Sequence, residues 1–300
     1  MILLITDSIC LWICSWCWCV LVLVAPQLKH VLPTEEPVWG LASLDDCLYV
    51  LRSRSAEQVE VYGIPDYMFQ CHRFIPKLDG LSDMAASIKD RCLYLVDCVA
   101  KCVKAVNDDY SITWPVNDNP WGISITSSND ILITCDEACK LKIFSPIGKL
   151  LREIPLYPNI TNPCHAVETV DGNFVVCYGA EMDPFRCVCL INADGRAIIT
   201  YCGGSAGQMT KPCHLAVDED GFVFVADANG MVQMLSPGLG FMWDVASTGN
   251  SLSGKPWRLS VDRQRLCVAD NKCFDGKWTV GRVVIFELWP FIVNIQPLAR

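Results

Sequence analysis

The feature that most constrains this chain is an internal repeat. A short apolar run, preceded in most copies by proline, returns roughly every 43 residues, which is the period of a four-stranded structural unit. Six copies align, the one beginning at Leu81 being degenerate. Their equivalent positions, called anchor positions below, are Gly40, Asp83, Gly122, His165, His214 and Arg258. A single unit of this size cannot bury its own apolar faces, so the copies must stack on one another.

Each copy carries the signals of four short strands. The anchor run is followed by a turn such as Asp220-Gly221, and then by three further apolar or alternating runs such as FVFVAD. β-Branched and aromatic residues between Gly, Asn and Asp turns are typical of strands. No apolar period of 3.6 residues persists for three turns after Leu28. We therefore predict an all-β fold, a six-bladed β-propeller of the TolB-like type with four-stranded antiparallel blades, over residues 27–300.

The two ends of this repeat predict how the ring closes. The run LKHVLPT precedes the first anchor without a blade of its own, and the last copy has only three clear strands, ending at Leu288. We expect Leu28–Leu32 to supply the outer strand of the last blade. The tail LWPFIVNIQPL competes for that place, although Pro290 is a poor residue for a central strand.

Residues 1–26 form a separate hydrophobic segment. No residue between Ser8 and Leu28 is charged, and a run of that length is sufficient to cross a bilayer as a helix. Three interpretations stay open: a membrane anchor or uncleaved signal through residues 8–28, a strand or helix docked on the fold, or an incomplete chain start. Cys14 and Cys17 have C-x-x-C spacing, but no second pair at zinc spacing accompanies them, so we predict no metal there.

Composition limits the compartment and the partners. The 19 cysteines are an odd number, and many lie in apolar runs, which favours reduced, buried thiols and a cytoplasmic protein. A membrane-anchored or secreted location is the alternative that the N-terminal run leaves open. The net charge of −9 argues against a protein that coats nucleic acid over its whole surface, and we predict no DNA binding.

Several units resemble a known repeat. KPCHLAVDEDGFVFVADANGMVQMLSP, which begins at Lys211, and NPWGISIT, which begins at Asn119, resemble NHL repeats, the units of six-bladed propellers in tripartite-motif ubiquitin ligases. The resemblance implies a protein-recognition role related to substrate recognition by ubiquitin ligases. It departs from the family in keeping the anchor glycine only at Gly40 and Gly122, and in having no RING or B-box spacing, so we expect no ubiquitin transfer by this chain.

Four aspartates end the second strand of their units, at Asp97, Asp136, Asp227 and Asp270. We expect them to cap loops through hydrogen bonds from backbone N–H groups, because aspartate favours such local contacts.

The residues next to the anchors are the main candidates for chemistry. Trp39, Trp121 and Trp257 each precede an anchor, which predicts either an aromatic rim for a peptide or base, or packing between blades. His165 and His214 each follow Pro-Cys in adjacent units; two Cys-His pairs could bind zinc, but we favour ordinary packing. The ion site of propeller lactonases needs carboxylate or amide ligands before the anchors, and none is present.

The last unit carries an excess of basic residues with aromatic neighbours, a combination suited to single-stranded RNA. The basic residues are Lys255, Arg258, Arg263, Arg265, Lys272, Lys277 and Arg282, and the aromatic ones are Trp257, Phe274 and Trp278. The overall acidity and the acidic pairs Asp136/Glu137 and Glu181/Asp183 argue against RNA.

Taken together, these features favour a monomeric, non-enzymatic protein-interaction module that binds a protein or peptide, without catalytic residues, metal or cofactor; we expect no enzyme activity. The candidate binding face is made of Trp39, Trp121, His165, His214, Trp257, Arg258, Lys272 and Trp278. The alternatives are an RNA-binding propeller and a metal-dependent propeller enzyme of the lactonase or lyase kind.

Overall fold

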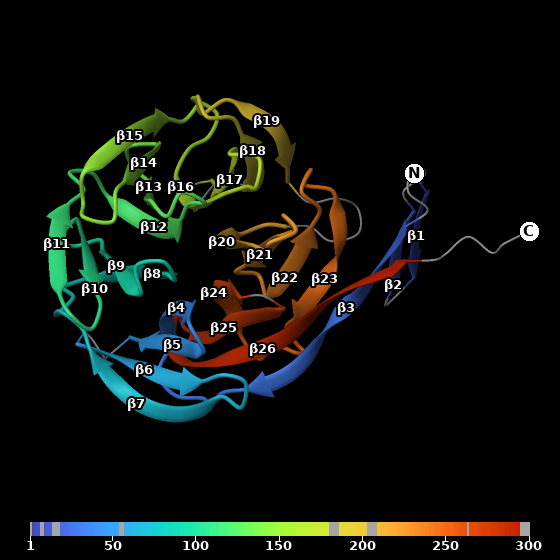
Figure 1. Cartoon of the computed structure of the whole chain (residues 1–300), viewed down its shortest axis with the longest axis horizontal. Helices are drawn as coiled ribbons and strands as arrows, with labels where there is room; N and C mark the ends of the chain where they lie inside the picture. The colour runs from blue at the N-terminus through green and yellow to red at the C-terminus, as the bar shows by residue number, and fades with distance from the viewer. Residues whose placement is uncertain are drawn as a thin grey trace, which may run out of the picture.

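The computed structural model describes residues 2–6, 9–13, 19–53, 57–179, 186–202, 209–262 and 264–294. All regular structure in these ranges is strand, arranged as six sheets around a central axis (Figure 1). The predicted all-β fold with six four-stranded antiparallel blades is therefore confirmed. No helix in the described ranges is long and apolar enough to cross a membrane. Cys14, Cys17, Glu181, Asp183 and Arg263, named above, lie outside the described residues.

The first three blades each consist of four strands in sequence order from the axis outward. Blade 1 contains β4 (Val38–Leu44), β5 (Cys47–Arg52), β6 (Gln58–Gly63) and β7 (Met68–Phe74). Blade 2 contains β8 (Leu81–Ser87), β9 (Cys92–Asp97), β10 (Cys102–Val106) and β11 (Ser111–Pro115). Blade 3 contains β12 (Pro120–Ile125), β13 (Ile131–Cys135), β14 (Lys140–Phe144) and β15 (Leu150–Pro155).

The fourth and fifth blades repeat this order, and the sixth is completed from the other end of the chain. Blade 4 contains β16 (Pro163–Glu168), β17 (Phe174–Tyr178), β18 (Cys187–Ile191) and β19 (Ala197–Tyr201). Blade 5 contains β20 (Pro212–Val217), β21 (Val223–Asp227), β22 (Met231–Leu235) and β23 (Phe241–Ser247). Blade 6 contains β24 (Lys255–Asp262), β25 (Arg265–Phe274), β26 (Lys277–Asn294) and β3 (Cys19–Val31).

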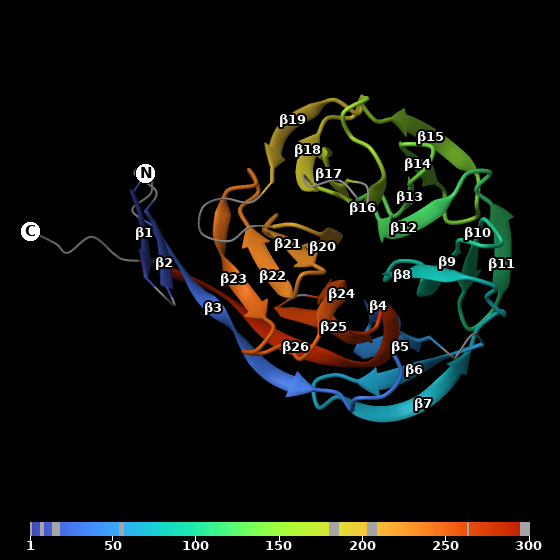
Figure 2. The same cartoon turned by 180° about the vertical axis from the view of Figure 1, so that it is seen from behind.

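The outer edge of blade 6 is where the two ends of the chain meet. Within β3, Val31 pairs with Val284 of β26, and Leu28 pairs with Phe286, so the N-terminal strand joins the last blade to the first. Both strands continue past the ring, and β1 (Ile2–Thr6) and β2 (Ile9–Ile13) extend the same sheet outward, as both views show (Figures 1 and 2). Beyond Leu288, β26 continues to Asn294. Residue 26 lies inside β3, so no break between elements marks the predicted boundary between residues 26 and 27. That boundary stays a prediction.

Apolar contacts between neighbouring blades hold the ring together. Each of the six blade-to-blade junctions encloses its own cluster of buried apolar side chains within the described residues. Leu32, 1% exposed, packs in the cluster between blades 6 and 1, next to Val283. A disulfide joins Cys187 to Cys202 in blade 4.

One irregularity recurs in all six innermost strands. The pairing register between the first and second strand of every blade shifts at the residue before the anchor. This β-bulge places two consecutive residues opposite one partner, and such bulges redirect side chains near functional sites. The bulged residues are Trp39, Ser82, Trp121, Cys164, Cys213 and Trp257. The repeat thus sets six anchor residues around one axis, four of them with side chains, and six bulged side chains beside them.

Candidate functional site

The innermost strands bring four anchor side chains together on the axis. Asp83 of β8, His165 of β16, His214 of β20 and Arg258 of β24 form what we call the axial cluster. The four residues are 1%, 2%, 5% and 2% exposed, respectively. Arg258 Nε lies 3.0 Å from Asp83 Oδ1, and His165 Nε2 and His214 Nε2 lie 3.3 and 3.4 Å from Asp83 Oδ2. The cluster therefore ties blades 2, 4, 5 and 6 to a single carboxylate.

Backbone groups complete the partners of this carboxylate. The N–H of Met84 donates to Oδ1 at 2.9 Å, and the N–H of Ile123 donates to Oδ2 at 3.1 Å. Burial alone would raise the pKa of Asp83, but the Arg258 guanidinium and the two histidines hold that pKa well below its usual range. Asp83 is thus an ionised carboxylate in a buried site, and it is neutralised by Arg258.

The hydrogen bonds of the two histidines fix their tautomers. His165 Nε2 contacts only acceptors, Ile123 O at 3.1 Å and Asp83 Oδ2, so it carries a proton. His214 Nδ1 accepts from the N–H of Leu259 at 3.3 Å, so its proton is on Nε2. Burial, followed by the neighbouring His165, lowers the pKa of His214 to about 3. His214 is therefore a neutral ring, and each histidine directs an Nε2–H group at Asp83, with the ring centroids 3.8 Å apart.

These tautomers decide whether the cluster fits a metal ion. Asp83, His165 and His214 offer ligand atoms within 4.8 Å of one another, the kind of set that binds zinc. Zinc binding would need a lone pair on each Nε2, and in His214 this would move the proton to Nδ1, against the Leu259 N–H. The donor set does not fit a divalent cation, and no metal chemistry is assigned to it.

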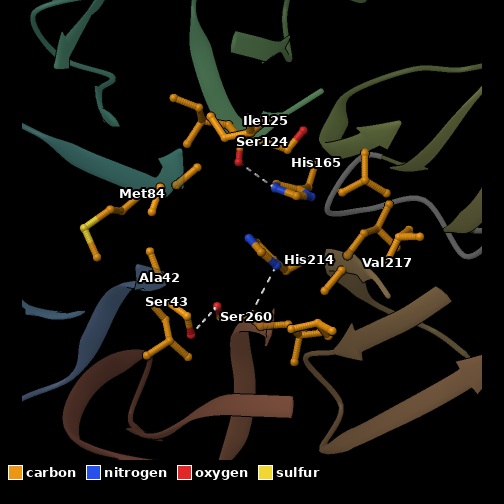
Figure 3. Close-up of a pocket in the computed structure, with 18 of the residues that line it drawn as sticks. Ala42, Ser43, Met84, Ser124, Ile125, His165, His214, Val217 and Ser260 are labelled. Carbon is orange, nitrogen blue, oxygen red and sulfur yellow. Dashed lines mark hydrogen bonds between the residues drawn. The ribbon is translucent and has the colours of Figure 1, made fainter. Parts of the chain in front are cut away.

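A small cavity lies against the axial cluster, between the innermost strands of the blades. It has a volume of about 210 Å³, and His165, His214, Ser43, Ser124 and Ser260 are among its lining residues (Figure 3). Most of the remaining lining is aliphatic. Gly122 is required here by space, because a Cβ would lie 2.8 Å from the His165 ring and 2.7 Å from Cys164 O. This cavity has little room for more than a few waters or a very small ligand.

A larger cavity opens where the innermost strands begin. Its volume is about 590 Å³, within the usual range for small-molecule sites. We call it the anchor-face cavity, and its lining includes Trp121, Asp136, Cys164, Arg186, Lys211, Cys213, Lys255, Trp257 and Trp278. Three of the bulged residues, Cys164, Cys213 and Trp257, line it while the anchors that follow them belong to the axial cluster. The bulge thus separates consecutive side chains into two sites.

Six of the eight predicted binding-face residues lie in these two sites, and Trp39 and Lys272 lie outside them. Trp121, Trp257 and Trp278 line the anchor-face cavity; the ring centroids of Trp257 and Trp278 are 5.1 Å apart. Trp39 meets Trp257 edge-on at 5.9 Å. His165, His214 and Arg258 differ from the expected exposed face, because the ion pair and hydrogen bonds to Asp83 bury them. Lys272 is exposed on β25 and does not line the cavity.

The four strand-ending aspartates fall into two kinds. Asp97, Asp227 and Asp270 each accept two backbone N–H bonds from the loop before their blade's first strand, for example from Thr210 and Lys211 to Asp227 at 2.6 and 3.0 Å. The carboxylate of Asp136 instead receives the N–H of Glu137 at 2.6 Å and lines the anchor-face cavity. Burial raises the pKa of Asp136 above its ordinary value. Loop capping therefore explains Asp97, Asp227 and Asp270, whereas Asp136 does not cap the loop before its blade's first strand.

Cys164 is the second unusual group in the cavity. A hydrogen bond from the Cys177 thiol lowers the pKa of Cys164, burial opposes this, and the charges of Arg186 and Arg258 lower it further. Burial raises the pKa of its two thiol neighbours Cys177 and Cys213. Cys164 is partly exposed and has a lowered pKa, two properties that reactive cysteines share.

Sequence reasoning missed Asp83, Asp136, Cys164 and Lys211 as site residues. The signal for Asp83 was its anchor position, because equivalent positions of a closed ring meet on the axis. Asp136 was grouped with its three capping equivalents, and nothing in the sequence separates it from them. The reactivity of Cys164 depends on the bulge that brings it to Cys177, which periodicity does not reveal.

Comparison with known proteins is informative at the level of the fold. No family model and no curated protein matches the chain. A virginiamycin B lyase from Staphylococcus aureus is similar over 88% of this chain and 89% of that chain, with a TM-score of 0.57 and 15% identity. A streptogramin B lyase is similar over 86% and 98%, with a TM-score of 0.60 and 12% identity. A PQQ-bound aldose sugar dehydrogenase from Streptomyces coelicolor is similar over 87% and 98%, with a TM-score of 0.62 and 12% identity.

These likenesses support the six-bladed propeller, and they do not single out the NHL propellers of tripartite-motif proteins. They also correct the functional prediction. The structurally similar proteins named here are enzymes, which overturns the main prediction of a non-enzymatic interaction module and the expectation of no enzyme activity. The enzyme alternative takes its place as the hypothesis to develop.

Proposed function

We propose that this protein is an enzyme of the lyase kind whose substrate binds in the anchor-face cavity. The observation that carries the proposal is the pairing, in one cavity of ligand size, of an acid and a thiol with opposite pKa shifts. Burial raises the pKa of Asp136, whereas the neighbouring Cys177 and nearby positive charges lower the pKa of Cys164. Cavities that gather such groups are the default candidates for active sites.

An elimination reaction needs one group of each kind. The Cys164 thiolate would take a proton from a carbon of the substrate, and the electron pair of that C–H bond would form the new double bond. The bond to the leaving group then breaks, and Asp136 would donate its proton to the departing oxygen or nitrogen. Cys164 ends as a thiol and Asp136 as a carboxylate, and exchange of one proton through water restores both.

The surrounding residues give these two groups their properties. The neighbouring Cys177 lowers the pKa of Cys164, and Arg186 adds positive charge. A negative charge on Asp136 would raise the pKa of Cys164, so protonation of Asp136 favours the Cys164 thiolate. Trp121 and Trp257 supply apolar walls that exclude water. The proposal uses neither a metal at the axial cluster nor the resemblance to NHL repeats.

Turnover of a defined panel tests this proposal. The full chain is incubated with quinupristin, the ligand of a catalytically inactive variant of the Staphylococcus aureus lyase, and with simpler cyclic and linear esters, and the products are identified by mass spectrometry. We expect a product with a new double bond and no added water. Cys164→Ser should lower the rate at least tenfold, whereas Cys71→Ser, at an exposed thiol on β7, should not. Absence of any turnover, or equal rates for both variants, would overturn the proposal.

A further inference from the structure

We propose that the anchor-face cavity selects ligands that combine a planar ring with an anionic group, such as an aromatic carboxylate or a nucleoside monophosphate. The inference rests on the proposed function in using the same cavity, and it names the chemical class of the substrate. Two features of the cavity wall carry it, an aromatic side and a cationic side.

The aromatic side is formed by three tryptophans from three different strands. Trp121 comes from β12, Trp257 from β24, and Trp278 from β26. The Trp257 ring is held from two directions, by Trp278 at 5.1 Å and by Trp39 edge-on at 5.9 Å. Indole rings fixed in this way offer flat apolar surface at low entropic cost, and a planar ring stacks on them well.

The cationic side stands out against an acidic protein. Lys211, Lys255 and Arg186 line the cavity, and Asp136 is the acidic residue among its lining residues, although the whole chain carries a charge of −9. In blades 2 and 3, Lys104, Lys140 and Lys142 each contact an aspartate. Within the described ranges, Lys211 and Lys255 make no such ion pair. They are available to an anion that enters the cavity.

One of these charges already acts on a group inside the cavity. Arg186, together with Arg258 outside the lining, helps to lower the pKa of Cys164, so these two charges favour negative charge at that point. An anionic ligand would experience this field as well. Much of the basic charge predicted for an RNA surface is used elsewhere, because Arg258 pairs with Asp83 and Arg282 with Asp270 at 2.8 Å. The basic side chains that remain near the tryptophans suit a compact anion better than an RNA polymer.

Calorimetric titration of the full chain tests the ligand class with two matched probes. 1-Naphthoate carries the ring and the charge, and 1-naphthalenemethanol carries the ring alone. We expect naphthoate to bind at least tenfold more tightly than the alcohol. Lys211→Gln and Lys255→Gln should each weaken naphthoate severalfold and leave the alcohol unchanged, because a charge-assisted contact is lost. Lys149→Gln, in an exposed turn of blade 3, is the control that should change neither.

Additional arms identify the source of the anion and separate this inference from the proposed function. Uridine and adenosine monophosphates, titrated in the same way, show whether a nucleotide satisfies the site better than a carboxylate. Equal affinity for the two naphthalene probes, or binding of an eight-residue oligouridine without binding of naphthoate or either nucleotide, would overturn the inference. Naphthoate binding that survives in Cys164→Ser, with no turnover of any panel substrate, would remove the proposed lyase function and keep the ligand class. Turnover of neutral esters without preference for anions would keep the proposed lyase function and remove the ligand class.

Discussion

The axial cluster and the anchor-face cavity are built from consecutive residues of the same strands, yet their polar groups are used in opposite ways. His165, His214 and Arg258 are all engaged by Asp83, whereas the bulged residues just before them open onto a cavity. In the cluster every charge has a partner inside the fold. In the cavity Asp136, Lys211 and Lys255 are available to something that is not part of the chain. The contrast teaches that the two buried histidines have their hydrogen-bonding groups occupied within the fold, whereas the residues beside them, for which we propose a chemical role, face a cavity.

The largest expected effect is on the cluster. Asp83→Ala leaves Arg258 buried without its counter-charge and should lower the free energy of unfolding by about 3 to 5 kcal/mol. Urea denaturation measures this change. Asp171→Ala, in an exposed turn, is the matched control and should stay within about 0.5 kcal/mol of the wild type. A wild-type stability for Asp83→Ala would show that the cluster does not hold the ring.

A smaller effect separates the two kinds of strand-ending aspartate. Asp227→Ala leaves the N–H groups of Thr210, Lys211 and Asn229 without their carboxylate acceptor. It should lower the free energy of unfolding by about 3 kcal/mol. Asp136→Ala removes one short local hydrogen bond and should cost less than about 1 kcal/mol. Denaturation of the two variants side by side checks this, and equal losses would place Asp136 among the structural caps.

The pH dependence of stability should come from the cluster. The pKa of His214 is about 3 in the folded protein and 6.5 in the unfolded chain. Between these values the unfolded state binds the extra proton, so stability is complete above pH 6.5 and falls as the pH drops, by up to about 1.4 kcal/mol per pH unit. Asp83, with its lowered pKa, adds a loss in the same direction at lower pH. Urea titrations at pH 7, 6 and 5 should give a flatter slope for His214→Gln; an unchanged slope would assign the effect elsewhere.

The smallest effect is chemical and leaves stability unchanged. Cys164 should react with iodoacetamide at lower pH than the exposed Cys71, because the hydrogen bond from Cys177 and nearby positive charges favour its thiolate. Peptide mass spectrometry after brief alkylation between pH 6 and 8 follows both sites in one sample. Naphthoate should protect Cys164 and not Cys71. Alkylation of Cys71 before Cys164 throughout that range would contradict the lowered pKa.

The fold was predictable from the sequence because each of its units repeats the same strand and turn signals, so six weak patterns reinforce one another. The axial cluster was only half predictable. The sequence placed His165 and His214 at equivalent positions of adjacent units, but it suggested no role for Asp83, whose unit, LSDMAASI, is the degenerate copy. The anchor-face cavity was least predictable, since Trp278 reaches it from the β25–β26 hairpin and Cys164 acquires its character from Cys177 on the next strand. Such properties arise from register and packing, which are set by the whole ring.

The most direct test of the central claim compares turnover by Asp136→Ala and Asp227→Ala, the same change at equivalent positions of two blades. The substrate is the best one that the wild-type protein converts, and rates are expressed per folded molecule. We predict that Asp136→Ala folds normally and loses at least tenfold in rate, because the leaving group receives no proton. Asp227→Ala should be less stable but keep its rate when folded. Full activity in Asp136→Ala would contradict the assignment of the anchor-face cavity as the active site.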